Sequence, residues 1–171
     1  MEPLAHASIA LIAKPFAPKA PLWALIAATQ VPDILSMGFL AIGIEHGATS
    51  QLDFAHGLQY LSEPSTPWSH GIPMSILWAA VVAAAGLLVW RDRRTSLLLG
   101  LMVLSHWALD FIAYRKMPLL FRSSPSGGLG LITSGPGLVA GIILELGLIA
   151  GGIVVFVVTR NRARASGRSP S

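Results

Sequence analysis

Cysteine is absent from the 171-residue sequence, which excludes disulfide bonds, thiolate metal ligands and a cysteine nucleophile. Charged residues are scarce, at 12%, whereas 53% of the residues are hydrophobic and the mean hydropathy is +0.65. Soluble domains carry about 25% charged residues, so this composition predicts a membrane protein. The net charge of +4 would suit nucleic acid, but the basic residues form short clusters beside apolar runs, as charges next to a membrane do. Nucleic-acid binding is therefore not expected.

Four apolar segments are long enough to cross a membrane, because about 20 helical residues span a hydrocarbon core about 30 Å thick. They cover residues 21–44, 69–90, 95–114 and 135–159. A further apolar segment, residues 3–13, is too short to span and is expected to form a re-entrant or interfacial helix. We therefore predict an all-α membrane protein. Residues 1–160 would form a single membrane-embedded helical domain, and residues 161–171 a disordered basic tail.

The basic residues predict the orientation of the spans. They fall in three connections that an even number of spans places on one side, which should be the cytoplasm. These residues are Lys14, Lys19, Arg91, Arg93, Arg94, Arg160, Arg162, Arg164 and Arg168. Residues 45–68 and 115–134 are then outer loops, and the C-terminal tail is cytoplasmic. The predicted location is the inner membrane of the cell, crossed several times.

Six ionisable residues lie inside the apolar segments, and none of them is lysine or arginine. They are His6, Asp33, His70, His106, Asp110 and Glu145. A charge inside a membrane costs at least about 2.5 kcal/mol and needs a partner. Three arrangements would satisfy the carboxylates: they are protonated, they pair with protonated histidines, or they share divalent cations. We expect the third arrangement, because three carboxylates and three neutral imidazoles match one or two divalent ions, and mixed shells of this kind suit zinc.

The spacing and depth of these residues predict a common site. His106 and Asp110 are four residues apart, so both side chains lie on one face of a helix and can hold one ion; a simple hydrogen bond between them is the alternative. At about 1.5 Å per residue, the polar residues can meet in the outer half of the membrane, around a water-accessible pocket. Pro32, beside Asp33, is expected to break its helix so that the backbone lines a cavity.

Short motifs at these positions resemble those of a known family. They are "VPD" ending at Asp33, "WSHGIPMS" around His70 and "SHWALDF" with His106 and Asp110, together with His6 near the start of the chain. This pattern looks like that of the YdjM-like inner-membrane metal-dependent hydrolases, and the resemblance covers most of the chain up to Asp110. The order of the ligating residues is also similar to that of zinc-dependent phospholipase C enzymes.

The resemblance implies a hydrolase that uses a metal-activated water on a lipid-linked ester, with a phosphoester as the expected bond, as in a phospholipase or lipid phosphatase. The expected cofactor is one or two divalent ions, with zinc the first choice. The resemblance also implies a role for each of the six residues. His70, His106 and Asp110 hold the principal ion, and His6 and Glu145 complete its shell or bind a second ion. Asp33 ligates the metal or acts as the catalytic residue that orients the attacking water.

The chain also departs from the family pattern. YdjM-like proteins usually carry a second Asp and a His soon after the "PD", where this chain has "IL" after Asp33. They also tend to carry another His shortly before the "SH" motif, where this chain has "PW". A complete second metal site is therefore not implied. His46 and His56, in the first outer loop, remain open as substitute ligands.

Three cations lie in the second outer loop, where the charge rule predicts few. Arg115, Lys116 and Arg122 could hold an anionic headgroup of a substrate, and the glycines of "SSPSGGLGLITSGPG" could let backbone N–H groups approach a phosphate. A flexible loop with cations that reach toward the membrane surface is the plainer interpretation.

A proton- or metal-coupled small transporter is the alternative function, because such proteins also keep carboxylates and histidines within their spans. Four spans without an internal repeat make a small transporter, which would have to dimerise, so a homo-oligomer remains open. The hydrolase interpretation instead predicts a membrane lipid or lipid-linked substrate, reached at a site that faces the outer side of the membrane.

Overall fold

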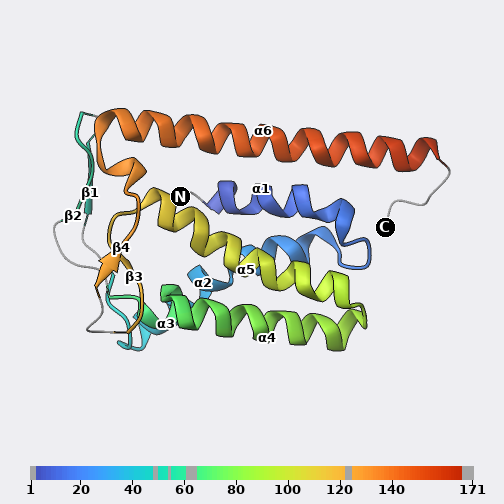
Figure 1. Cartoon of the computed structure of the whole chain (residues 1–171), viewed down its shortest axis with the longest axis horizontal. Helices are drawn as coiled ribbons and strands as arrows, with labels where there is room; N and C mark the ends of the chain where they lie inside the picture. Colours follow the sequence, from blue (N-terminus) through green and yellow to red (C-terminus); the bar gives the residue numbers. More distant parts are fainter. Residues whose placement is uncertain (1–2, 48–49, 54, 61–64, 122–124, 167–171) are drawn as a thin grey trace.

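The computed structural model describes residues 3–47, 50–53, 55–60, 65–121 and 125–166 as a helical bundle with two small β-hairpins (Figure 1). Two of its helices are 3₁₀ turns, written η. The elements follow one another as α1 (Pro3–Ala13), η1 (Lys14–Phe16), α2 (Leu22–Ala41), β1 (Ser50–Asp53), β2 (Gly57–Tyr60), α3 (Pro67–His70), α4 (Ile72–Trp90), α5 (Arg93–Ala113), β3 (Met117–Pro118), β4 (Ser126–Gly127), η2 (Leu131–Thr133) and α6 (Gly135–Ala165).

Four helices, α2, α4, α5 and α6, are long and apolar enough to cross a membrane, and α1 is a shorter apolar helix. The predicted all-α fold is therefore confirmed. The bounds differ most at α6, which continues to Ala165 and so includes residues that we expected to begin a disordered tail. At 31 residues α6 is longer than a membrane requires, so its basic end extends beyond the apolar part.

The helices lie alongside one another, and their connections gather at two opposite ends (Figure 1). One end carries both antiparallel hairpins, α3 and η2, and we call it the hairpin end. The other end carries η1, the connection between α4 and α5, and the C-terminal end of α6. The basic residues of the three clusters that the structure describes lie in or next to these last three segments, so they share one end of the bundle, while Arg168 lies outside the described residues. The assignment of this end to the cytoplasm remains our prediction.

Helix α1 packs inside the bundle, against α6, α2 and α5. Ala5 and Ala10 have no exposed surface. Whether this helix is re-entrant or interfacial stays a prediction, but it packs against three longer helices rather than standing apart from them. Gly152 makes the close approach feasible, because a Cβ atom at this position would lie 2.8 Å from the carbonyl oxygen of Ser8. Small residues commonly allow helices in membranes to approach in this way.

Replacing Gly152 with leucine should push α1 away from α6 and lower the stability of the bundle by about 1–3 kcal/mol, the usual cost of overpacking. Thermal unfolding in detergent would measure the loss. Gly147→Leu on the same helix is the matched control, because a Cβ atom at Gly147 meets nothing within 4 Å. Equal melting temperatures for the two variants would contradict this account of the contact.

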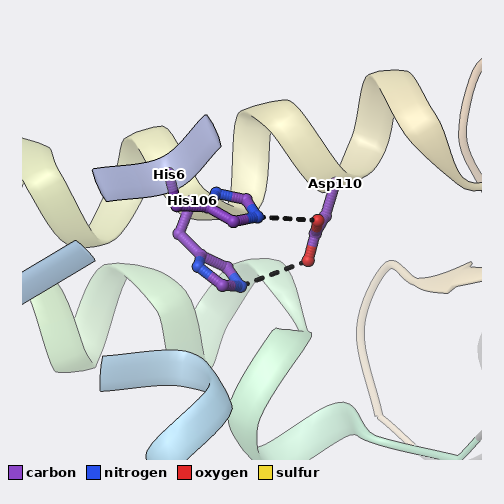
Figure 2. A group of neighbouring side chains, drawn as sticks. All are labelled: His6, His106 and Asp110. Carbon is purple, nitrogen blue, oxygen red and sulfur yellow. Dashed lines mark ion pairs between the residues drawn. The ribbon is translucent and has the colours of Figure 1, made fainter. Parts of the chain in front are cut away.

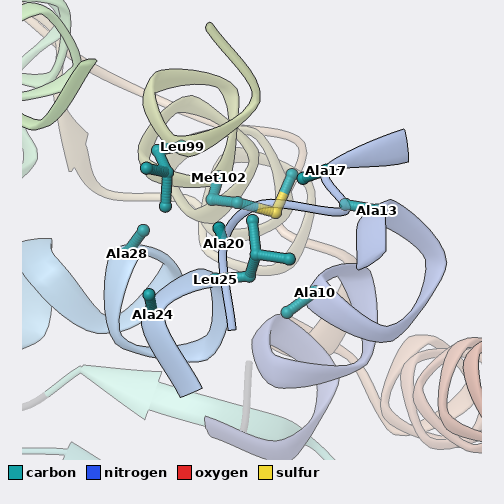
Figure 3. Close-up of a cluster of buried hydrophobic side chains, with 9 residues drawn as sticks. All are labelled: Ala10, Ala13, Ala17, Ala20, Ala24, Leu25, Ala28, Leu99 and Met102. Carbon is teal, nitrogen blue, oxygen red and sulfur yellow. The ribbon is translucent and has the colours of Figure 1, made fainter. Parts of the chain in front are cut away.

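The core near the η1 end consists mainly of alanines from α1, α2 and the segment between them, which meet two side chains of α5 (Figure 3). Small side chains bring the three backbones close together, so the packing fixes the relative positions of the helices that carry the candidate site. The buried cluster comprises Ala10, Ala13, Ala17, Ala20, Ala24, Leu25, Ala28, Leu99 and Met102.

Two expectations about the backbone were wrong. Pro32 does not break its helix, since α2 is continuous from Leu22 to Ala41 with Pro32 inside it. His70 does not begin the second span: it ends α3, and Gly71 is extended before α4 starts at Ile72. Both features matter for the site, because Asp33 sits on the uninterrupted helix and His70 on a separate turn.

Candidate metal centre

Five of the six predicted residues meet in the bundle, toward the hairpin end. His6 comes from α1, Asp33 from α2, His70 from α3, and His106 and Asp110 from α5. They form two overlapping groups that could each hold a metal ion, and the ligand atoms of each group lie within 4.8 Å of one another. The first group is His6, His106 and Asp110, and the second is Asp33, His70 and His106. The side chains converge from four separate elements.

The first group is almost completely buried. Asp110 Oδ1 lies 3.3 Å from His6 Nε2, and Asp110 Oδ2 lies 3.2 Å from His106 Nε2 (Figure 2). The second distance confirms that His106 and Asp110 share one helix face. The two imidazole rings stack with their centroids 3.9 Å apart. Among the described residues, no hydrogen-bond partner serves either ring nitrogen of His6 or Nε2 of His106. Such buried nitrogens are costly unless another partner, such as an ion, satisfies them.

The second group brings in the one carboxylate of the cluster that is open to the surroundings. Asp33 Oδ1 lies 3.4 Å from His106 Nε2 and 3.5 Å from His70 Nε2. His70 Nε2 is also 3.7 Å from Asp110 Oδ2, so the two groups are contiguous. The Asp33 side chain is 43% exposed, whereas that of His70 is 10% exposed. Asp33 is therefore the cluster residue best placed to meet a substrate or a water.

The backbone of α2 fixes the orientation of His106. Its Nδ1 lies 2.7 Å from the carbonyl oxygen of Thr29. A carbonyl only accepts, so Nδ1 carries the hydrogen and donates it, and the lone pair of a neutral ring is left on Nε2. The carbonyl oxygen of Thr29 has two lone pairs, so it can accept a hydrogen bond from this histidine of α5 in addition to one within its helix.

A buried glutamate that our sequence interpretation missed supports His70. Glu45 accepts a hydrogen bond from the Ser69 hydroxyl at 2.7 Å, and the same hydroxyl lies 2.7 Å from His70 Nδ1. Glu45 directly follows an apolar segment, where an acidic residue is usually a solvated boundary charge. The serine immediately before His70 was the only signal of this contact in the sequence.

The charge of the cluster matches one divalent ion. Two carboxylates, Asp33 and Asp110, meet three imidazoles, so the formal charge of the cluster is −2 when the histidines are neutral. His106 Nε2 has a single lone pair and can serve only one ion, although both groups include it. The two groups therefore cannot both be complete around separate ions. The donors are nitrogen and oxygen atoms, as zinc and similar divalent metals take in proteins.

The other predicted ligands belong to neither of these groups. Glu145, half-buried on α6, belongs to neither group. His46 is exposed, and its backbone pairs with Ser65 at the hairpin end. His56 is exposed as well and belongs to neither group. The loop histidines therefore do not substitute for missing ligands in this arrangement.

The predicted substrate-binding cations follow α5. Arg115 is exposed and Lys116 is half-buried, just after the helix ends at Ala113. They lie at the hairpin end, and they follow Asp110 closely in the sequence. Arg122 lies outside the described residues.

The glycine-rich loop has a structural role at the end of α5. Gly128 and Gly130 have positive φ angles, of 145° and 67°. In this conformation the N–H of Leu129 donates a hydrogen bond to the carbonyl oxygen of Phe111, at 2.8 Å. The N–H of Gly130 donates one to the carbonyl oxygen of Tyr114, at 3.3 Å. These two N–H groups serve carbonyls at the end of the helix, so they are not the ones to bind a phosphate.

Comparison with known proteins gives one positive result. No curated protein and no solved structure matches the sequence. The model of the family described as YdjM inner membrane protein matches residues 3–166. The match includes all four apolar helices and all five residues of the cluster. With its helices suited to several membrane crossings and its buried histidines and aspartates able to hold a metal ion, the chain belongs to the YdjM inner membrane protein family.

Proposed function

We propose that this protein is a membrane-embedded, metal-dependent hydrolase that cleaves an ester bond of a lipid-linked substrate, with a phosphoester as the preferred bond. One observation carries the proposal: a buried cluster of three histidines and two aspartates in which only Asp33 is substantially open. The buried members suit a bound cation, and the open carboxylate suits a reacting water. A site that only stabilised the fold would not need this open acid.

The cluster residues have separate roles in this proposal. His6, His70, His106 and Asp110 would hold the ion, and zinc is the ion that we propose for this donor set. A bound divalent ion supplies a Lewis acid for the scissile group and activates water near neutral pH. Asp33 would hold and orient the attacking water and accept its proton, because its Oδ1 lies beside two of the ligand nitrogens.

The surroundings of Asp33 favour a lipid substrate. Met37, one turn later on the same face of α2, is 71% exposed, and the adjacent Ile34 is exposed as well. On a membrane-spanning helix this apolar surface would contact lipid chains. A substrate that approaches Asp33 from this side therefore needs an acyl or prenyl tail. Arg115, Lys116 and Arg122 would bind its anionic headgroup at the hairpin end, which we place toward the outer side of the membrane.

The direct test is hydrolysis of membrane lipid by the purified protein. Zinc-loaded protein in detergent is incubated with a lipid extract, and released phosphate or headgroup is measured by mass spectrometry. We expect turnover that needs the metal and that persists in His56→Ala, in which an exposed histidine outside the cluster is removed. Parallel liposomes report metal flux. Flux without turnover would support a small transporter and overturn the hydrolase proposal.

A further inference from the structure

Glu45 is a buried carboxylate that lies outside both groups of candidate metal ligands. Only 1% of its surface is exposed, although it follows α2 in a connecting segment. Its Oε1 accepts hydrogen bonds from the backbone N–H groups of Trp68 and Ser69, each at 2.8 Å. Its Oε2 accepts from the Ser69 hydroxyl at 2.7 Å. Both carboxylate oxygens are thus used, and all three donors belong to α3, the turn that ends at His70.

The hydrogen-bond chain determines which nitrogen of His70 carries hydrogen. The Ser69 hydroxyl has one hydrogen and gives it to Glu45, so its lone pairs face His70 Nδ1, 2.7 Å away. Nδ1 must then be the donor. The lone pair of the neutral ring is left on Nε2, the nitrogen that lies 3.5 Å from Asp33 and 3.7 Å from Asp110.

The segment around Glu45 is itself held in place. The backbone of the neighbouring His46 pairs with that of Ser65 through two hydrogen bonds, of 3.0 and 2.8 Å. This bridge joins the end of α2 to the start of α3. It holds Glu45 against α3 even though Glu45 and Ser69 are 24 residues apart in sequence.

We propose that Glu45 is a positioning residue that acts through Ser69 to keep Nε2 of His70 free for a metal ion. The inference rests on the proposed function, because it gives that metal site its supporting residue. Partners of this kind fix the tautomer and the ring orientation of ligating histidines, and their loss typically costs about 10- to 100-fold in metal affinity.

The decisive variant is Glu45→Gln, which keeps the shape of the side chain. The amide oxygen can still accept from the two N–H groups of α3. The amide nitrogen, however, donates where Oε2 accepted, so the Ser69 hydroxyl must turn its hydrogen toward His70 Nδ1. The hydrogen of His70 then moves to Nε2, and we expect zinc affinity, measured by competition with a chelator, to fall by about 10- to 100-fold.

Two further variants test whether Glu45 acts through Ser69. In Ser69→Ala the link is gone, so adding Glu45→Gln should change the affinity no further, which a double-mutant cycle measures. Ser96→Ala is the matched control, because Ser96 is also buried but hydrogen-bonds the Asp92 carbonyl at the other end of the bundle. Additive losses of zinc affinity from Glu45→Gln and Ser69→Ala would overturn the proposal that Glu45 acts on His70 through Ser69, which we call the Glu45–Ser69–His70 relay.

A second measurement does not depend on metal. Nitrogen-15 NMR of histidine-labelled, metal-free protein reports which ring nitrogen carries hydrogen, and His70→Asn assigns the signal. We expect hydrogen on Nδ1 in the wild type and on Nε2 in Glu45→Gln. An unchanged tautomer in the variant overturns the inference whether or not zinc binds. Absence of zinc from a wild type that shows the expected tautomers overturns the proposed function and leaves the relay supported.

Discussion

His106→Ala is expected to remove stoichiometric divalent metal from the purified protein. His106 belongs to both candidate groups, has no exposed surface and points Nε2 toward both aspartates. Its loss leaves each group with two residues. The decrease in affinity should exceed about 100-fold, because even losing a ligand's supporting partner costs about 10- to 100-fold. Elemental mass spectrometry of protein in detergent measures the metal content.

The matched control is His56→Ala, which removes an exposed histidine and should retain the metal. Because His106→Ala leaves a cavity in the bundle, Asp110→Asn serves as a second variant of nearly unchanged volume. It removes the carboxylate that lies within 3.7 Å of all three ligand histidines, so the same loss of metal is expected. Wild-type metal content in a folded Asp110→Asn protein would contradict the proposed centre.

Asp33→Asn is expected to separate catalysis from metal binding. The four buried ligands remain in this variant, so most of the metal should be retained. Hydrolysis should fall by about 10²- to 10⁴-fold, the usual contribution of a positioned general base. Initial rates on the lipid extract at saturating zinc measure this loss, which should appear mainly in kcat.

Metal analysis of the same Asp33→Asn preparation gives the control. A loss of metal as complete as in His106→Ala would make Asp33 a ligand rather than the base. Unchanged hydrolysis would refute both roles. Met37→Leu, a change of similar volume on the same exposed face, should leave metal content and unfolding temperature unaltered.

The sequence predicted what depends on local pattern. The four spans are continuous apolar runs, so their existence follows from length and composition. The contact of His106 with Asp110 follows from helical spacing. We predicted that these two residues meet His6, Asp33 and His70 from the free-energy cost of placing ionisable groups in a membrane. Such groups need common partners when no lysine or arginine is near.

What could not be predicted depends on how helices pack. The direction in which Glu145 faces is set by the rotation of α6, and the close contact at Gly152 has no signal in hydrophobic periodicity. The continuity of α2 through Pro32 has no signal in the local sequence, because a proline inside a helix usually kinks or breaks it. Glu45 is buried because α3 folds back against the end of α2, which no local pattern near Glu45 indicates.

The packing of α1 against α6 has a consequence for biosynthesis. Helix α1 emerges from the ribosome long before α6 is synthesised. The contact between α1 and α6 therefore forms late, after the rest of the chain has been made. The packing around α1, which carries His6, is complete only after α6 has been inserted. A translation intermediate that ends before α6 would contain all five cluster residues but would lack the helix that covers α1, so we expect it to hold a metal ion less firmly.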